Sequence, residues 1–117
     1  MRSVSGGVTI GVPVLAEVEQ RIDRAFQGEQ QGSRISFISY ELMHKVLTPL
    51  RWDILRAMAG QGPMTIRAIA DQVARDVHAV HRDVKALQLA GVLDKAENGQ
   101  AVFPYDSVHL DVTLKAT

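Results

Sequence analysis

The stretch that most constrains the fold runs from Thr65 to Leu87 and has the spacing of two short helices with a tight break between them. In the second predicted helix, apolar residues recur every three or four positions, which is helical periodicity. The apolar stripe consists of Val77, Val80, Val84 and Leu87. The opposite side carries His78, His81, Arg82 and Lys85. This layout is typical of a helix-turn-helix whose second helix enters the major groove of DNA.

Residues that begin and end helices mark four helical segments. The expected N-caps are Ser39, Thr48, Thr65 and Asp76. Their side-chain oxygens can accept hydrogen bonds from backbone N–H groups of the first turn. Pro49 follows Thr48 and suits the first position of a helix. The predicted helices end near Leu47, near Ala59, at the break before Asp76, and at Gly91, which is a favourable C-terminal stop.

Strand-like segments surround these helices. Strands are expected over residues 8–12, 34–39, 92–95, 100–103 and 108–114. The Asn98-Gly99 pair between the third and fourth of them is a strong hairpin signal. A hairpin directly after the second helix of a helix-turn-helix is the position of a wing. The alternating segment 108–114 predicts one buried and one polar face, and it could pair with residues 35–38 or with a symmetry mate.

The segment 14–26 has helical spacing of its apolar residues and a charged opposite face. An amphipathic helix of this kind could pack on the rest of the chain or form a dimerisation arm, and this is the interpretation that we favour. The alternative is an element that binds a partner protein. We therefore expect an N-terminal extension over residues 1–33 and a second domain over residues 34–117.

The charge of the chain is balanced, with 13 basic and 13 acidic side chains among 117 residues. Attraction to DNA would therefore need a local cationic face, dimerisation, or both. The chain has no cysteine, which excludes disulfides, thiolate zinc sites and a cysteine nucleophile. No apolar run approaches the roughly 20 residues of a membrane span. No signal-peptide segment opens the sequence, so we expect a cytoplasmic protein with no membrane partner.

Eight basic side chains are the candidates for contact with DNA. The expected base-reading residues are His78, His81, Arg82 and Lys85. The expected phosphate-binding residues are Arg51, Arg67, Arg75 and Lys95. Arg82 can form bidentate hydrogen bonds with O6 and N7 of guanine. Asp83 would repel phosphate if its side chain faced the DNA, and Glu97 at the hairpin tip weakens the contribution expected from the hairpin.

Enzyme motifs do not occur in the sequence. It contains no Gly-x-Ser-x-Gly elbow, and Ser5-Gly6-Gly7 lacks the lysine of a phosphate-binding loop. His78 and His81 have a spacing that can chelate a metal, but Asp83 is poorly angled to join them. We therefore expect no catalysis, no cofactor and no bound metal.

Several segments together resemble a family of small prokaryotic winged-helix proteins that are classed as DNA-binding transcriptional regulators. These segments are residues 46–55, 66–70 with 74–77, 80–87 and 102–106, and the resemblance covers roughly residues 34–114. Members of that family often look like antitoxins encoded beside a small toxin gene. The resemblance implies that the chain represses its own operon through His78, His81, Arg82 and Lys85, and that it neutralises a toxin through another surface.

The predicted fold is mostly α with a small antiparallel β-sheet (α+β), a winged helix-turn-helix with an N-terminal strand–helix extension. The predicted function is sequence-specific transcriptional regulation by a homodimer that binds an operator in double-stranded DNA, with the chain acting as an autorepressing antitoxin. The alternative is a protein-interaction module that keeps the winged-helix fold and binds a partner protein without reading DNA. The two hypotheses differ in whether binding requires Arg82 and Lys85.

Overall fold

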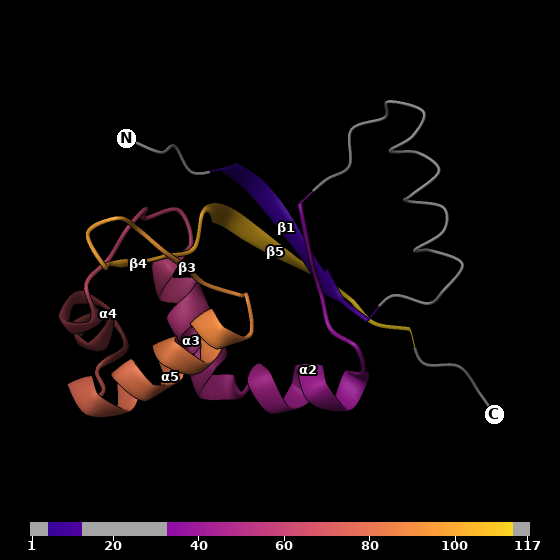
Figure 1. The fold of residues 1–117 in the computed structure, drawn as a ribbon, viewed down its shortest axis with the longest axis horizontal. Helices are drawn as coiled ribbons and strands as arrows, with labels where there is room; N and C mark the ends of the chain where they lie inside the picture. Colours follow the sequence, from indigo (N-terminus) through magenta and orange to yellow (C-terminus); the bar gives the residue numbers. More distant parts are fainter. Residues whose placement is uncertain (1–4, 13–32, 114–117) are drawn as a thin grey trace.

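The computed structural model of the chain describes residues 5–12 and 33–113, and within them the fold is mixed α/β (Figure 1). The helices are α2 (Tyr40–Val46), α3 (Pro49–Met58), α4 (Ile66–Val73) and α5 (Val77–Leu89). The strands are β1 (Ser5–Gly11), β2 (Arg34–Ser36), β3 (Asp94–Lys95), β4 (Ala101–Val102) and β5 (Tyr105–Asp111). The helix predicted over residues 14–26 lies outside the described residues.

Each described helix begins at the N-cap that the sequence predicts. The side chains of Ser39, Thr48 and Thr65 each accept a hydrogen bond from a backbone N–H in the first turn of α2, α3 and α4. The carboxylate of Asp76 accepts from the N–H groups of His78 and Ala79 at the start of α5. These bonds satisfy donors that have no partner inside the helix, so the helix starts follow from local chemistry.

The larger sheet has the strand order β2-β1-β5, and β1 runs parallel to both neighbours. The prediction of an antiparallel sheet is therefore wrong for this sheet, and β5 pairs with β1 rather than with residues 35–38. Parallel neighbours are joined by long connections and leave no turn signal in the sequence. The prediction of one buried face on the last strand is also wrong, because no residue of β5 is fully buried.

The central strand is packed closely between its neighbours. Arg34 of β2 reaches across β1 to Asp111 of β5, with 3.5 Å between Nη2 and Oδ2. Gly11 lies between these two side chains, and a Cβ atom at this position would overlap the carbonyl O of Asp111. Residues 5–11 are thus the middle strand of the sheet, although the sequence assigned them to an extension. The division of the chain at residue 33 stays a prediction.

The smaller sheet is the antiparallel hairpin that Asn98-Gly99 predicts, with β3 paired to β4. Its strands are shorter than expected and join through a turn in which Gly99 has φ of 85°. Met64, which precedes α4, exchanges two backbone hydrogen bonds with Ala101 of β4, at 2.8 and 3.0 Å. The segment between α3 and α4 therefore lies along the hairpin.

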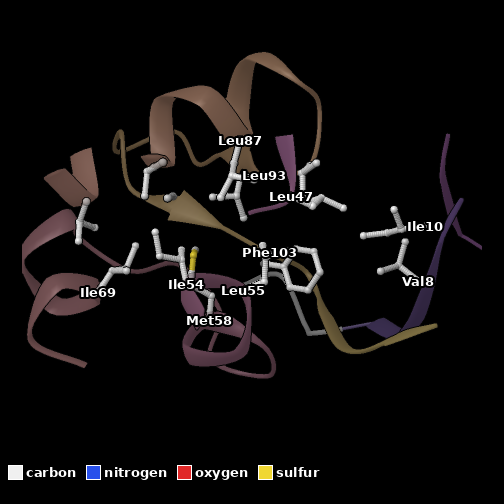
Figure 2. Packing of buried hydrophobic residues seen from close by; sticks show 14 of the residues in the cluster. Val8, Ile10, Leu47, Ile54, Leu55, Met58, Ile69, Leu87, Leu93 and Phe103 are labelled. Carbon is white, nitrogen blue, oxygen red and sulfur yellow. The ribbon is translucent and has the colours of Figure 1, made fainter. Parts of the chain in front are cut away.

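A single apolar core connects the helices with both sheets (Figure 2). Phe103 is fully buried beside the labelled residues of α3 on one side and Val8 and Ile10 of β1 on the other. Leu87 of α5 is also fully buried in this cluster. Within residues 5–12 and 33–113, no helix is long and apolar enough to cross a membrane.

Candidate nucleic-acid interface

The helix α5 has a buried side and an exposed side. Val80, Val84 and Leu87 are buried in the core. The exposed residues include His78, His81, Arg82 and Lys85. Their spacing of three, four and seven positions places these four side chains on one face of the helix. The structure therefore brings together the four residues that the sequence assigned to base reading, and it presents them to solvent.

The turn between α4 and α5 fixes the orientation of this face. Ala74 ends α4 in the left-handed conformation, with φ of 56° and ψ of 48°, and it is the only residue other than glycine with positive φ in the described part of the chain. Its N–H bonds back to Ala70 and Asp71, and the N–H of Arg75 bonds to the carbonyl O of Ala70 at 3.1 Å. These bonds close the end of α4 before Asp76 begins α5, so the two helices are joined by a short, defined turn.

Two of the expected phosphate-binding arginines are held by Asp83 of α5. Arg51 Nε donates to Asp83 Oδ1 at 3.1 Å, and Arg75 Nη1 donates to Asp83 Oδ2 at 2.8 Å. Arg51 also donates to the carbonyl O of Val46 at 3.0 Å. The three charged side chains are only 17–21% exposed. This cluster, the Arg51–Asp83–Arg75 triad, connects α3, the α4–α5 turn and α5, and it carries a net charge of +1.

The remaining two candidates for phosphate binding are exposed. Arg67 lies in the first turn of α4, and Lys95 ends β3 in the hairpin. A hollow of about 360 Å³ lies between the end of α5 and the hairpin, and its lining includes Lys85, Leu89 and Lys95. The structure thus brings Lys85 and Lys95 to the same hollow.

Two features of this surface were missed in the sequence. Asp83 was expected to repel phosphate if it faced outward, but its carboxylate is occupied by two guanidinium groups. Its position on α5 gave no signal, because Arg51 lies 32 residues away. Leu89 was assigned no role, yet its side chain is 89% exposed. Its place four positions after Lys85, on the polar face, is the signal that could have found it.

Among the described residues, no three His, Asp or Glu side chains gather as they would to hold a metal ion. Residues 46–110 match the model of the HVO_A0114 family. Because the match covers more than half of the 117 residues of the chain, the chain belongs to this family. The match spans α3, α4, α5 and the hairpin, together with most of β5. No curated protein and no solved structure matches the chain.

Proposed function

We propose that the chain is a sequence-specific transcriptional regulator that binds double-stranded DNA, and that α5 is its recognition helix. The observation that carries this proposal is the exposed face of α5, on which His78, His81, Arg82 and Lys85 stand together. The opposite face is anchored in the core by Val80, Val84 and Leu87. A helix of this kind can enter the major groove without disturbing the fold.

The order of elements supports a winged helix-turn-helix as the finer description of the fold. The order along the chain is α3, then Met64 bridged to Ala101 of β4, then α4 and α5 joined by a short turn, and then the β3–β4 hairpin. The bridge between Met64 and Ala101 supports this proposal because it brings the segment before α4 alongside the hairpin. In this arrangement α5 enters the groove and the hairpin is the wing.

The proposed contacts follow from the chemistry of the side chains. Arg82 suits bidentate recognition of guanine, and His78 lies in the first turn of α5, where base edges are usually reached. Arg67, Lys85 and Lys95 suit phosphate groups because their side chains are exposed. The Arg51–Asp83–Arg75 triad would add one net positive charge beside the DNA rather than two independent phosphate clamps.

The biological role that we propose is that of a cytoplasmic antitoxin, which represses its own operon as a homodimer and neutralises a cognate toxin. This part rests on the resemblance carried by the sequence motifs. The proposal includes no catalytic residue and no cofactor. A twofold dimer would match a palindromic operator, with the recognition helices about 34 Å apart.

A second candidate function, favoured by Leu89, is a protein-interaction module that does not read DNA. Leu89 is 89% exposed and shares its hollow with Lys85 and Lys95. Apolar surface rimmed by polar side chains is typical of sites where partner proteins bind, and Leu89 is an exposed apolar side chain among polar ones. The variant Arg82→Ala separates the two functions, because it should weaken operator binding and leave binding of a partner protein at the hollow intact.

The experiment that tests the proposal is fluorescence anisotropy with labelled DNA from upstream of the gene, compared with a scrambled duplex at two salt concentrations. We expect the upstream DNA to bind at least about a thousandfold more tightly than the scrambled duplex. Binding that is equally weak for both duplexes and disappears as salt rises would reflect attraction to phosphate alone. That result would refute sequence-specific regulation and leave the interaction module.

A further inference from the structure

The strand β5 has one unpaired edge within the described part of the chain. It lies at the end of the β2-β1-β5 order, and of the described strands only β1 pairs with it. It is seven residues long and contains neither proline nor lysine, which are residues that commonly block such edges. An edge of this kind can accept another strand, because its outward N–H and C=O groups have no partner in the sheet.

The register of the sheet identifies the outward groups. Thr9 donates its N–H to the carbonyl O of Ser33, and the carbonyl O of Gly11 accepts from the N–H of Phe37, so the backbone N–H and C=O groups of the odd-numbered residues of β1 point to β2. The backbone N–H and C=O groups of the even-numbered residues of β1 therefore point to β5. Val8 is the register partner of Val108, and in a parallel ladder it bonds to the residues on either side of that partner. The N–H and C=O groups of Val108 and Leu110 consequently point to the free edge.

An apolar groove runs beside this edge, between β5 and the helices α2 and α3. One part, of about 370 Å³, is lined by residues that include Trp52, Leu55, Val108 and Leu110. A second part, of about 280 Å³, is lined by residues that include Tyr40, Trp52 and Leu110. Trp52 and Leu110 border both parts, so we name them together the α3–β5 groove. Leu110 is 49% exposed at its rim.

We propose that β5 pairs with β5 of a second copy of the chain, antiparallel about a twofold axis at Val108. Val108 is the middle residue of β5, so this register uses the whole strand and joins the two sheets into one. The pairing puts Leu110 of each copy opposite Asp106 of the other. Asp106 lines the first part of the α3–β5 groove, and the partner's leucine side chain therefore enters that groove.

The register is also compatible with the charges of the strand. Ser107 lies opposite His109 of the second copy, and Tyr105 lies opposite Asp111, so hydrogen-bonding groups face each other. No position opposes two like charges, which would destabilise the pairing. A twofold axis at Asp106 would instead oppose two carboxylates. The self-complementary sequence of β5 thus favours a second copy as the occupant of this edge.

This inference deepens the proposed function, because it names the surface that forms the proposed homodimer, and it can be tested without DNA.

Analytical ultracentrifugation of the full chain tests the interface with Leu110→Asp, since the new carboxylate would lie directly opposite Asp106 of the second copy and like charges destabilise a strand pair. The matched control is Leu50→Asp, because Leu50 is 50% exposed and does not line the groove. We expect the wild type and the control to be dimers, and Leu110→Asp to dimerise at least about tenfold more weakly with an unchanged circular dichroism spectrum. A monomeric wild type would overturn the inference, as would a Leu110→Asp variant that dimerises normally.

Cross-linking gives a second measurement that does not depend on the folding of Leu110→Asp. The chain has no cysteine, so Ser107→Cys and His109→Cys each introduce a single thiol. Opposite residues of a non-hydrogen-bonded antiparallel pair have Cα atoms about 4.5 Å apart, within the range that a disulfide bridges. A mixture of the two variants should oxidise mainly to the mixed covalent dimer. Leu50→Cys is the control for random oxidation. If the mixture gives no more covalent dimer than this control, the proposed register is wrong.

The two proposals can fail independently in these experiments. A chain that dimerises through β5 and binds no operator would refute the proposed function and leave this inference standing. A monomer that binds operator with high specificity would refute the homodimer and leave α5 as the proposed recognition helix.

Discussion

Asp83 in α5 accepts a hydrogen bond from the Nε of Arg51 in α3, with 3.1 Å between the two atoms. The second oxygen of the same carboxylate accepts from Arg75 in the turn before α5. One carboxylate thus fixes α5 relative to both preceding helical elements. Because the proposed DNA-binding face lies on the same helix, the Arg51–Asp83–Arg75 triad couples the stability of the domain to the orientation of that face.

Replacing Asp83 by Asn should lower the free energy of unfolding by about 1–3 kcal/mol, because two partly buried guanidinium groups lose their counter-ion. The measurement is urea unfolding followed by circular dichroism. Asp53→Asn is the matched control, since the ion pair of Asp53 with Arg56 is exposed and should contribute less than about 1 kcal/mol. Equal effects of the two substitutions would show that the triad does not stabilise the fold.

Replacing Ala74 by Gly should raise the free energy of unfolding by up to about 1 kcal/mol. Ala74 has φ of 56°, a left-handed conformation that costs an alanine roughly 1–2 kcal/mol and that glycine adopts readily. Ala68→Gly, inside α4, should instead destabilise the protein by about 1 kcal/mol. Chemical unfolding of both variants checks the opposite signs. A loss of stability in Ala74→Gly would mean that the turn does not strain this residue.

Leu87 and Leu89 lie two positions apart in α5 and should respond differently to alanine. Leu87 is fully buried, and its truncation should cost about 2–5 kcal/mol because it leaves a cavity in the core. Leu89 is 89% exposed, and the same change there should alter stability by less than about 0.5 kcal/mol. Thermal unfolding of the two variants measures the difference. Similar losses would contradict the burial pattern of α5.

The features that the sequence predicts are those that depend on neighbouring residues. The cap of Asp76 involves N–H groups only two and three positions away, and the Asn98-Gly99 turn closes within the hairpin. The exposed row from His78 to Lys85 follows from helical periodicity alone. Local chemistry therefore gives the helix starts, the hairpin and the polar face of α5.

The features that the sequence does not predict depend on distant residues. Val8 and Val108 are register partners from opposite ends of the chain, and a parallel ladder has no local turn to announce it. The capture of Arg51 by Asp83 likewise depends on how α3 packs against α5. The larger sheet is therefore parallel where an antiparallel one was predicted. Two arginines that were expected to bind phosphate, Arg51 and Arg75, are held by Asp83 instead.

The most direct test of the proposed function compares Arg82→Ala with Lys45→Ala in binding to the DNA upstream of the gene. Each substitution removes one exposed positive charge, but Lys45 belongs to α2 and not to α5. If Arg82 reads a base, its loss should weaken binding by about 1–3 kcal/mol, roughly five- to 150-fold. The Lys45→Ala variant should bind nearly as well as the wild type. Equal affinities for the two variants would contradict the account that α5 is the recognition helix.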